Sequence, residues 1–382
     1  MKDSLVMEIK HYVNEYELKG RQINSIYFGD ENDDLINQMN LGLALPSTFD
    51  AVLQTISRYC YLPENAEITM EARGNPTSTE SKKLAEFRSI GINRLSLGLQ
   101  SLNPKDLRLL GRDHTVKEGI KSLEIAMPIF NGNVTFDLIF GRMNQEMALE
   151  MASNHVSLYE LTIKQGTPIY GDHKLGKYTI PTTDTMANMY EVTIQVAKEF
   201  GFNQYEVSNF ERNGSFSKHN FGYWRGLDYL GIGPGAHGRI YNPTTATRTR
   251  TYNILYPEEW MSQCEELGHG MRKSTQMTIQ DIKEELILFG LRTKVGITRS
   301  RFKLYSNGQE LEQYIDMKQV NSFVQDEFLA WDNGNDSTRQ KLDSNDQVWV
   351  PSDLANELKD GGLRPTEKGL AVIDEIIPRI LF

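Results

Sequence analysis

The sequence predicts an α/β protein built on a parallel sheet, and three observations lead to that class. Between residues 23 and 162, short apolar segments alternate with amphipathic helical patterns. The apolar segments are rich in β-branched or aromatic residues and are bounded by turn signals, as strands are. Strands that alternate with helices form a parallel sheet, either open or curled into a barrel. Functional side chains are then expected at the C-terminal ends of the strands.

Five segments are the predicted strands, and amphipathic stretches separate them. The strands are INSIYF (23–28), EITMEA (67–72), RLSLG (94–98), VTFDLIFG (134–141) and HVSLYELTI (155–163). Helices are predicted over 48–61, 78–90 and 115–130, with Thr48 and Thr115 as N-caps and Thr77 at the start of a similar turn. The first residues carry acids early and lack an apolar h-region. They are therefore predicted to form a helix of the mature fold and not a signal peptide.

The second half of the chain predicts a smaller domain. A helix over 184–200 leads to a strand in GFNQYEVSNF, and helices over 279–290 and 310–323 follow a polar connection. The closing segment LRPTEKGLAVIDEIIPRIL resembles the strand and helix of a winged-helix unit. The insert DNGNDSTRQKLDSND is predicted to be a disordered loop. The predicted division is 1–240 for the sheet region with its extension, 241–278 for the connection and 279–382 for the C-terminal domain.

Composition excludes several classes of function. The net charge is −10 and the Lys and Arg residues are scattered, so the chain offers no basic face for a nucleic acid. No apolar run approaches the length that spans a bilayer. A hydrophobic content of 39% in 382 residues is enough for a sizeable core.

The cysteine count restricts redox and metal chemistry. Cys60 and Cys264 are the two cysteines of the sequence, and they form no CxxC-type pair. A disulfide framework is not expected, and a reducing compartment is. A [4Fe–4S] cluster needs several closely spaced thiolates, so this chain is not expected to build one alone.

Polar residues fall where a parallel sheet would present them together. Glu71 ends one predicted strand, Gln100 follows another, and Asp137 lies inside VTFDLIFG between apolar residues. An ionised Asp137 would need a partner there, and Arg112 in LLGRDHT is the cationic candidate. Carboxylates and an amide at strand ends can bind ribose hydroxyls and an amino-acid group by directed hydrogen bonds. The alternative is a structural ion pair between Asp137 and Arg112, with a solvated Glu71.

The segment SKHNFGYWRGLDYLGIGPGAH is dense in groups that suit a flat aromatic ligand. His219 and His237 are imidazoles that can ligate haem iron, and Tyr223, Trp224 and Tyr229 can line such a ligand. The alternative is a packed aromatic corner in which His219 bonds a backbone carbonyl. Residue types alone leave both interpretations open.

Together these segments resemble the oxygen-independent coproporphyrinogen III oxidase-like family of radical SAM proteins, over nearly the whole chain from residue 23 onward. The motifs that carry the resemblance include INRLSLGLQSLNPKDLRLLGRDHT, FDLIFG, HVSLYELTIKQGTPIY, FNQYEVSNFERNG and GLRPTEKGLAVIDEIIPRIL. HNFGYW fits the HNxxYW pattern of the haem chaperone branch of that family. The resemblance implies a partial (β/α)6 radical SAM barrel with a small helical, winged-helix-like C-terminal domain.

The resemblance also implies cofactors and the residues that hold them. The positions that it assigns to S-adenosylmethionine are Glu71, Gln100, Arg112 and Asp137. For haem it makes His219 the leading candidate for the iron ligand, and Tyr223 and Trp224 are the aromatic candidates beside it.

The sequence departs from the family pattern at sharp breaks between well-matched flanks. Family members begin with a strand and a CxxxCxxC-type loop that holds a [4Fe–4S] cluster, and this sequence starts after that point. DENDDLINQMNLG stands where GGGTPS is expected, EARGNP where ExNP is expected, and RMNQEMALEMASN where LPGQT is expected. These breaks suggest an alternative or mispredicted splice product of a eukaryotic gene. A transcript that restores the cysteines would support this hypothesis, and a clean genomic reading frame across the breaks would contradict it.

Three functions are compatible with this sequence. The first is a haem-binding chaperone that delivers haem to acceptor proteins. The second is a radical SAM enzyme of the coproporphyrinogen III oxidase type in porphyrin biosynthesis, which would be inert without a cluster to supply an electron. The third is an inactive, truncated isoform whose exposed sheet edge favours aggregation or a covering partner. The expected location is mitochondrial for a eukaryotic source and cytoplasmic otherwise. The sequence is also compatible with a homo-oligomer.

Overall fold

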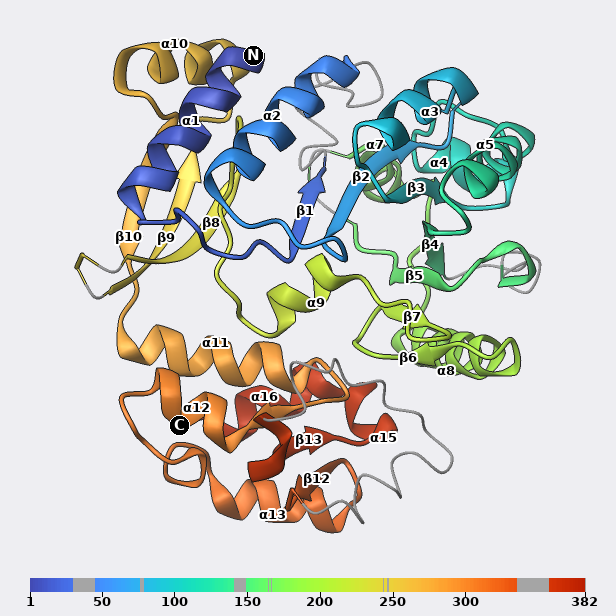
Figure 1. The fold of residues 1–382 in the computed structure, drawn as a ribbon. Helices are drawn as coiled ribbons and strands as arrows, with labels where there is room; N and C mark the ends of the chain where they lie inside the picture. The colour runs from blue at the N-terminus through green and yellow to red at the C-terminus, as the bar shows by residue number, and fades with distance from the viewer. Residues whose placement is uncertain are drawn as a thin grey trace. The chain divides into compact units, whose positions relative to one another are not determined.

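A computed structural model describes two compact units of the chain (Figure 1). The first unit consists of Met1–Val196, Ser217–His219 and Asp228–Gln276, and the second of Ala197–Phe216, Asn220–Leu227 and Met277–Phe382. Within these limits the structure describes residues 1–29, 45–75, 79–140, 149–163, 165, 167–242, 244–245, 247–334 and 357–381.

A parallel sheet forms the centre of the first unit. Its strands are β1 (Ser25–Phe28), β2 (Glu67–Arg73), β3 (Arg94–Gln100), β4 (Val134–Phe140) and β5 (His155–Glu160), which pair in chain order (Figure 1). The predicted α/β class and the parallel sheet are confirmed. Among the described strands β1 has β2 as its single strand neighbour, so hydrogen bonds do not close the sheet into a full barrel.

Alternation along the strands gives this sheet one apolar and one polar face, because successive side chains point to opposite sides. On the apolar face, Phe49 of α2 (Pro46–Tyr59) contacts Phe28 of β1 and Phe87 of α3 (Ser81–Ser89), with ring centroids 4.5 and 4.9 Å apart. On the polar face, residues in register between neighbouring strands are Tyr27 with Thr69, Glu71 with Ser96, and Asp137 with Ser157.

The helices that follow the strands begin where their first turns can be capped. Thr115 precedes α5 (Val116–Ile129) and forms a capping box with Glu118, which confirms the predicted N-cap. The predicted N-cap at Thr48 is wrong, because α2 already begins at Pro46, whose fixed φ suits the first helical position. Thr77 lies outside the described residues. The other helices of this region are α4 (Pro104–Leu109), α7 (Pro168–Lys174) and α8 (Thr183–Glu199).

A second, antiparallel sheet belongs to the same unit. Its order is β10 (Met271–Gln276), β9 (Thr247–Asn253) and β8 (His237–Asn242), and α10 (Pro257–Leu267) joins β9 to β10. Residues 241–278, expected to be a polar connection, therefore contain regular structure. Gly231 fits against the backbone of His237 so closely that a Cβ atom would lie 2.1 Å from its carbonyl oxygen.

The N-terminal helix α1 (Lys2–Glu15), which the sequence predicts, contributes a buried carboxylate that binds groups in and around this sheet. Glu8 accepts the backbone N–H groups of Gly233 and Gly270, each at 2.8 Å. The side chains of Asn253 and Trp260 also donate to it, at 3.0 and 3.3 Å. Burial outweighs these four bonds and raises the pKa of Glu8 to about 7.

The second unit contains two short antiparallel strands, β6 (Asn203–Gln204) and β7 (Asn209–Glu211). The prediction of one strand through GFNQYEVSNF is wrong, because the chain turns between these two pieces. Glu206 supports the turn by accepting from the backbone N–H of Ser208 at 3.1 Å and from the side chain of Asn209. A carboxylate that bonds the backbone two residues onward favours a turn over a continuous strand.

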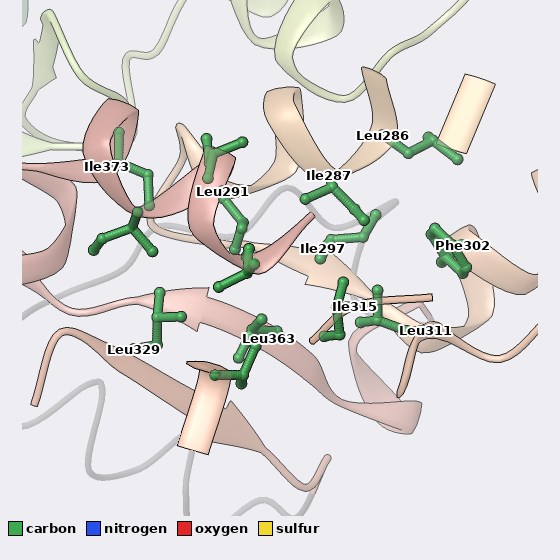
Figure 2. Close-up of a cluster of buried hydrophobic side chains, with 14 of the residues drawn as sticks. Leu286, Ile287, Leu291, Ile297, Phe302, Leu311, Ile315, Leu329, Leu363 and Ile373 are labelled. Carbon is green, nitrogen blue, oxygen red and sulfur yellow. The ribbon is translucent and has the colours of Figure 1, made fainter. Parts of the chain in front are cut away.

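Helices around a small sheet form the rest of the second unit. The sheet order is β11 (Ile297–Thr298), β13 (Gly362–Pro365) and β12 (Leu329–Asp332), all antiparallel. The helices include α11 (Ile279–Leu291), α12 (Arg299–Tyr305), α13 (Met317–Gln325), α15 (Glu367–Leu370) and α16 (Ile373–Ile380). Figure 2 shows their core, in which Leu286, Leu291, Ile297 and Phe302 pack together with Leu363. This arrangement agrees with the predicted winged-helix-like domain.

The predicted helix over 310–323 needs a correction. Asp316 accepts from the backbone N–H groups of Lys318 and Gln319 and so begins α13 at Met317, after a separate 3-10 turn at Leu311–Gln313. The insert that the sequence predicts to be disordered lies almost entirely outside the described residues. Among the described helices, none is both long enough and apolar enough to cross a membrane.

Candidate functional site

Glu71 and a tyrosine meet on the polar face of the parallel sheet. Glu71 lies near the C-terminal end of β2, and Tyr27 of β1 donates its phenolic proton to the Glu71 Oε2 atom at 3.1 Å. Burial, together with the nearby carboxylates of Glu71 and Asp137, raises the pKa of Tyr27 well above its ordinary value. The phenol therefore stays protonated at neutral pH and acts as a donor.

Asp137 lies two strands away, on the same polar face. Burial raises the pKa of Asp137 to about 6, while a hydrogen bond from Ser157 and the charge of Arg112 act in the opposite direction. The predicted electrostatic relationship between Asp137 and Arg112 is therefore present. It fits a binding site and a structural pair equally well, so both interpretations of this pair stay open.

Gln100 ends β3 in an unusual conformation. Its φ is +64°, a region that a non-glycine residue rarely adopts, and the register between β3 and β4 shifts just before it. The shift places Gln100 opposite Leu138, which directly follows Asp137. A positive φ at a non-glycine residue shows that the surrounding fold holds the backbone in a strained conformation. Such strained positions are common at functional sites.

The C-terminal end of the polar face is rich in hydrogen-bond acceptors. Two carboxylates and an amide, from Glu71, Asp137 and Gln100, can accept from ribose hydroxyls and an ammonium group. The hydroxyl of Thr69 is buried and has no hydrogen-bond partner among the described residues. The protein groups of this face therefore leave hydrogen-bonding capacity that a bound polar molecule or water can fill.

The opposite end of the same face anchors the helix α9 (Lys218–Trp224). Glu67, at the start of β2, accepts from the backbone N–H groups of Lys218 and His219 at 3.0 and 3.1 Å, and from the Ser217 hydroxyl at 3.3 Å. Arg94 of β3 forms a buried ion pair with Glu67 at 3.3 Å. The first turn of α9 is thus capped by a side chain from a distant strand.

A second buried polar pair stands beside Arg94. Thr135 of β4 and His155 of β5 approach to 2.6 Å between the hydroxyl and the ring Nδ1 atom. Burial and the charge of Arg94 lower the pKa of His155 well below its ordinary value, so this imidazole is neutral. Buried polar contacts therefore link β2 to β3 and β4 to β5 at the N-terminal end of the polar face.

His219 lies on the polar face between these two ends. Its imidazole stacks on the ring of Tyr27, with centroids 4.8 Å apart and planes inclined by 12°. Burial lowers the pKa of His219 to about 4, although the nearby Glu67 carboxylate acts to raise it. The imidazole is therefore neutral at physiological pH, and neutral imidazole is the form that ligates iron.

Trp224 and Tyr223 follow at the other end of α9, in the second unit. The Trp224 ring meets Phe289 edge to face at 6.1 Å, and the Arg292 guanidinium lies 5.2 Å from its centroid. The buried indole N–H of Trp224 has no hydrogen-bond partner among the described residues. Tyr223 is partly exposed, and its backbone carbonyl accepts from Gly226 at 2.8 Å. Trp224 thus contacts Phe289 and Arg292, whereas His219 contacts Tyr27 and Glu67.

Two hollows of the described residues differ widely in volume. The cavity lined by Phe221, Trp224 and Arg225 has a volume of about 20 Å³, which is room for one water molecule. An open hollow of about 410 Å³ lies elsewhere, in the first unit, and its walls are polar and apolar in equal parts. Its lining residues are His11, Asn14, Glu15, Asn242, Thr244 and Thr245. Neither hollow is a preformed apolar slot for a macrocycle.

Asn220 of the HNFGYW motif has a structural contact in the second unit. Its side chain donates to the Glu206 carboxylate at 3.2 Å, and burial raises the pKa of Glu206. The same carboxylate supports the turn between β6 and β7. Asn220 therefore has a structural contact within the second unit, whereas His219 has its contacts with Glu67 and Tyr27 within the first.

The two thiols do not fit a cluster site. Cys60 and Cys264 are both buried and unbridged, and burial raises the pKa of each, to about 12 for Cys264. A metal-binding cysteine needs the thiolate, which these surroundings disfavour. In the described part of the chain, no group of three or more His, Cys, Asp or Glu side chains is arranged to hold a metal ion.

Tyr27 and Glu67 are the two site residues that the sequence analysis missed. A signal for Glu67 existed, because Glu67, Thr69 and Glu71 are spaced by two and must share one face of a strand. The same spacing places Tyr27 with Ser25 on one face of β1. The contacts of both residues with the segment 217–219 depend on the tertiary fold and leave no local signal.

Comparisons with known proteins place this geometry in context. No family model matches the sequence. Radical S-adenosyl methionine domain-containing protein 1, mitochondrial, of Danio rerio is 34% identical over 371 residues, which cover 94% of this chain and 76% of that protein. Heme chaperone HemW of Bacillus subtilis is 33% identical over 246 residues, or 62% of this chain and 63% of that protein, which is less than two thirds of its length.

A solved structure extends the likeness to the fold. Coproporphyrinogen III oxidase (HemN) from Escherichia coli, a radical SAM enzyme, superposes with a TM-score of 0.70 over 98% of this chain and 81% of that one. The sequence identity is 17%, so this likeness concerns the fold alone.

Proposed function

This chain belongs to the oxygen-independent coproporphyrinogen III oxidase-like family of radical SAM proteins, in its haem chaperone branch, and from that premise we propose that it binds haem and passes it to acceptor proteins. The helix α9 carries the three haem candidates His219, Tyr223 and Trp224. In this proposal His219 is the iron ligand, and the two aromatic residues contact the macrocycle.

The protonation state of the His219 imidazole is the main support for this proposal. Its imidazole is neutral at physiological pH because burial lowers its pKa to about 4, so no proton has to leave before iron binds. The capping of α9 by Glu67 fixes the backbone of this residue. A ligand imidazole on a fixed backbone is preorganised, which reduces the entropic cost of binding.

Binding of S-adenosylmethionine is a second part of the proposal. Glu71, Gln100 and Asp137 would accept hydrogen bonds from it, and Arg112 would keep Asp137 ionised. When bound beside a reduced cluster, the sulfonium group supplies a radical. The thiols of this chain do not fit such a cluster, so no catalytic step is assigned here.

The alternative function is an oxidase of the coproporphyrinogen III type, and a further alternative is an inactive, truncated isoform. The fold is shared with the oxidase, but fold alone does not determine function. The presence of HNFGYW favours haem binding over the oxidase reaction. For the location of the protein we propose the mitochondrion, which the name of the Danio rerio relative contains.

A haemin titration tests the binding step. A saturable Soret shift is expected for the wild type, and His219→Ala should raise the haemin Kd about tenfold or more, equivalent to roughly 1.4 kcal/mol. His237→Ala is the matched comparison, because His237 is an exposed imidazole of the same sequence segment. Equal affinity in wild type and His219→Ala, with both folded by circular dichroism, would remove the ligand assignment.

A transfer experiment tests the chaperone step. The haem-loaded chain is mixed with increasing amounts of an apo-globin, and the acceptor Soret band is followed in time. Direct transfer gives a rate that rises with acceptor concentration, whereas spontaneous release gives a rate independent of it. A concentration-independent rate equal to release into buffer would reduce the proposed function to haem storage.

A further inference from the structure

Tyr27 touches both candidate sites of the first unit. Its hydroxyl donates to Glu71, the carboxylate proposed for S-adenosylmethionine, at 3.1 Å. Its ring stacks on His219, the proposed iron ligand, at 4.8 Å between centroids. One rigid aromatic ring carries both contacts, so a movement of that ring changes both.

The Glu71 contact is one that a bound ligand would compete for. A phenol that donates to a carboxylate forms a charge-assisted bond, and the ammonium group of an amino-acid ligand is a stronger donor to the same oxygen. An ammonium group that binds Glu71 therefore displaces the phenol or forces it to share the carboxylate.

The His219 imidazole is the group that can respond to a movement of the Tyr27 ring. The backbone of His219 is held by Glu67 at 3.1 Å, so the first turn of α9 stays in place. The imidazole is restrained in addition by its stacking on Tyr27, with planes only 12° apart. A turn of the Tyr27 ring therefore acts on the orientation and solvation of the imidazole, and leaves the helix in place.

We propose that Tyr27 is a positioning residue that couples the two sites, holding His219 restrained until a cationic amino-acid-type ligand takes the Glu71 carboxylate. This inference rests on the proposed function, since it concerns regulation of the same haem site. When the phenol leaves Glu71, its ring releases the imidazole for iron. Coupling between binding sites is reciprocal, so haem bound at His219 strengthens binding at Glu71 by the same factor.

The first test needs no haem. The chain has seven histidines, so a histidine-labelled sample gives few NMR signals, and the His219 signal is identified by its loss in His219→Gln. Saturating S-adenosylmethionine should shift the His219 signal in the wild type. In Tyr27→Phe, which lacks the hydroxyl that donates to Glu71, calorimetry should still show binding of S-adenosylmethionine while the His219 signal stays unchanged.

A ligand-free arm keeps the test independent of S-adenosylmethionine. Glu71→Gln weakens the acceptor of the phenol and should shift the His219 signal by itself, and this shift should vanish when Tyr27→Phe is added. The inference is overturned if the wild-type signal ignores both S-adenosylmethionine and Glu71→Gln, or if Tyr27→Phe responds as the wild type does.

The second test measures the coupling itself. S-adenosylmethionine should lower the haemin Kd of the wild type about fivefold or more, which is the lower end of typical coupling. Tyr27→Phe should bind haemin as tightly as the loaded wild type and ignore S-adenosylmethionine. If the NMR coupling is found but no variant binds haemin, the proposed function fails and the coupling stands. If haemin binds with an affinity that S-adenosylmethionine does not alter, the coupling fails and the proposed function stands.

Discussion

The carboxylate of Glu67 accepts the backbone N–H of His219 at 3.1 Å, although 152 positions separate the two residues in the chain. A side chain at the start of a central strand thus performs the capping that a helix usually obtains from its own N-cap residue. The acceptor is buried together with Arg94, which balances its charge. This one carboxylate therefore connects the stability of the sheet to the position of the proposed haem ligand.

Glu67→Gln should destabilise the first unit by about 3 kcal/mol, because removing one member of a buried ion pair leaves Arg94 without its counter-charge. The measurement is the free energy of unfolding from urea titrations. Glu64→Gln is the control, since Glu64 is an exposed carboxylate in the turn just before β2 and its loss should change stability by less than about 0.5 kcal/mol. Equal stability of both variants would show that Glu67 is dispensable.

Much of the parallel sheet could be predicted, because it is encoded in local patterns. Alternating side chains with β-branched residues defined β2 and β4 closely, and the capping pattern at Thr115 defined the start of α5. Glu71 and Asp137 were recognised as site candidates for the same reason. Residues near strand ends of a parallel sheet are expected to gather at one edge.

The contacts that organise the site could not be predicted in this way. The stacking of Tyr27 on His219 joins β1 to α9, and no periodicity relates these two positions. The sequence predicts one strand where the structure has the hairpin of β6 and β7, because strands of two and three residues are too short to show an alternation of apolar and polar residues. In both cases tertiary packing decides the structure, and it overrides local propensity.

The buried Glu8 should make stability depend on pH. Its pKa is 4.5 ordinarily and about 7 in the folded chain, so the folded state holds more protons than the unfolded state between these values. The contribution of Glu8 is therefore fully present below about pH 4.5 and is lost as the pH rises through 7. The loss amounts to about 3 kcal/mol by linkage.

Glu8→Gln isolates this contribution from those of other acids. The free energy of unfolding is measured at pH 5 and pH 8 for both chains, and the change across this interval is compared. The wild type should lose more stability than Glu8→Gln as the pH rises, because the amide does not ionise. An equal change in both chains would show that Glu8 ionises freely in the folded state.

Asp137 should make the binding of S-adenosylmethionine depend on pH. The pKa of Asp137 is about 6, and the ionised carboxylate is the stronger acceptor for ribose hydroxyls. The affinity should therefore fall about tenfold as the pH drops from 7 to 5, in proportion to the fraction that remains ionised. Isothermal titration calorimetry across this range gives the midpoint.

The role of Arg112 follows from the same titration. Its charge lowers the pKa of Asp137, so Arg112→Gln should move the midpoint to higher pH. Lys105→Gln removes an equal charge from an exposed position of α4 and should leave the midpoint unchanged. A midpoint that moves equally in both variants would indicate a general effect of net charge, and a midpoint that stays fixed in Arg112→Gln would separate Arg112 from the site.

The low pKa of His219 gives haem binding a distinctive pH profile. An exposed imidazole has a pKa near 6.5 and is about ten-elevenths protonated at pH 5.5, so it would lose roughly tenfold in affinity for iron between pH 8 and 5.5. His219, with a pKa of about 4, stays neutral over that interval. The haemin Kd of the wild type should therefore be nearly constant from pH 8 to pH 5.5. Tyr27→Ala exposes the imidazole to water, which should raise its pKa and restore the pH dependence. Tyr27→Phe still covers the imidazole with an aromatic ring and should retain the flat profile. A tenfold loss in the wild type at pH 5.5 would contradict the assignment of the iron to His219.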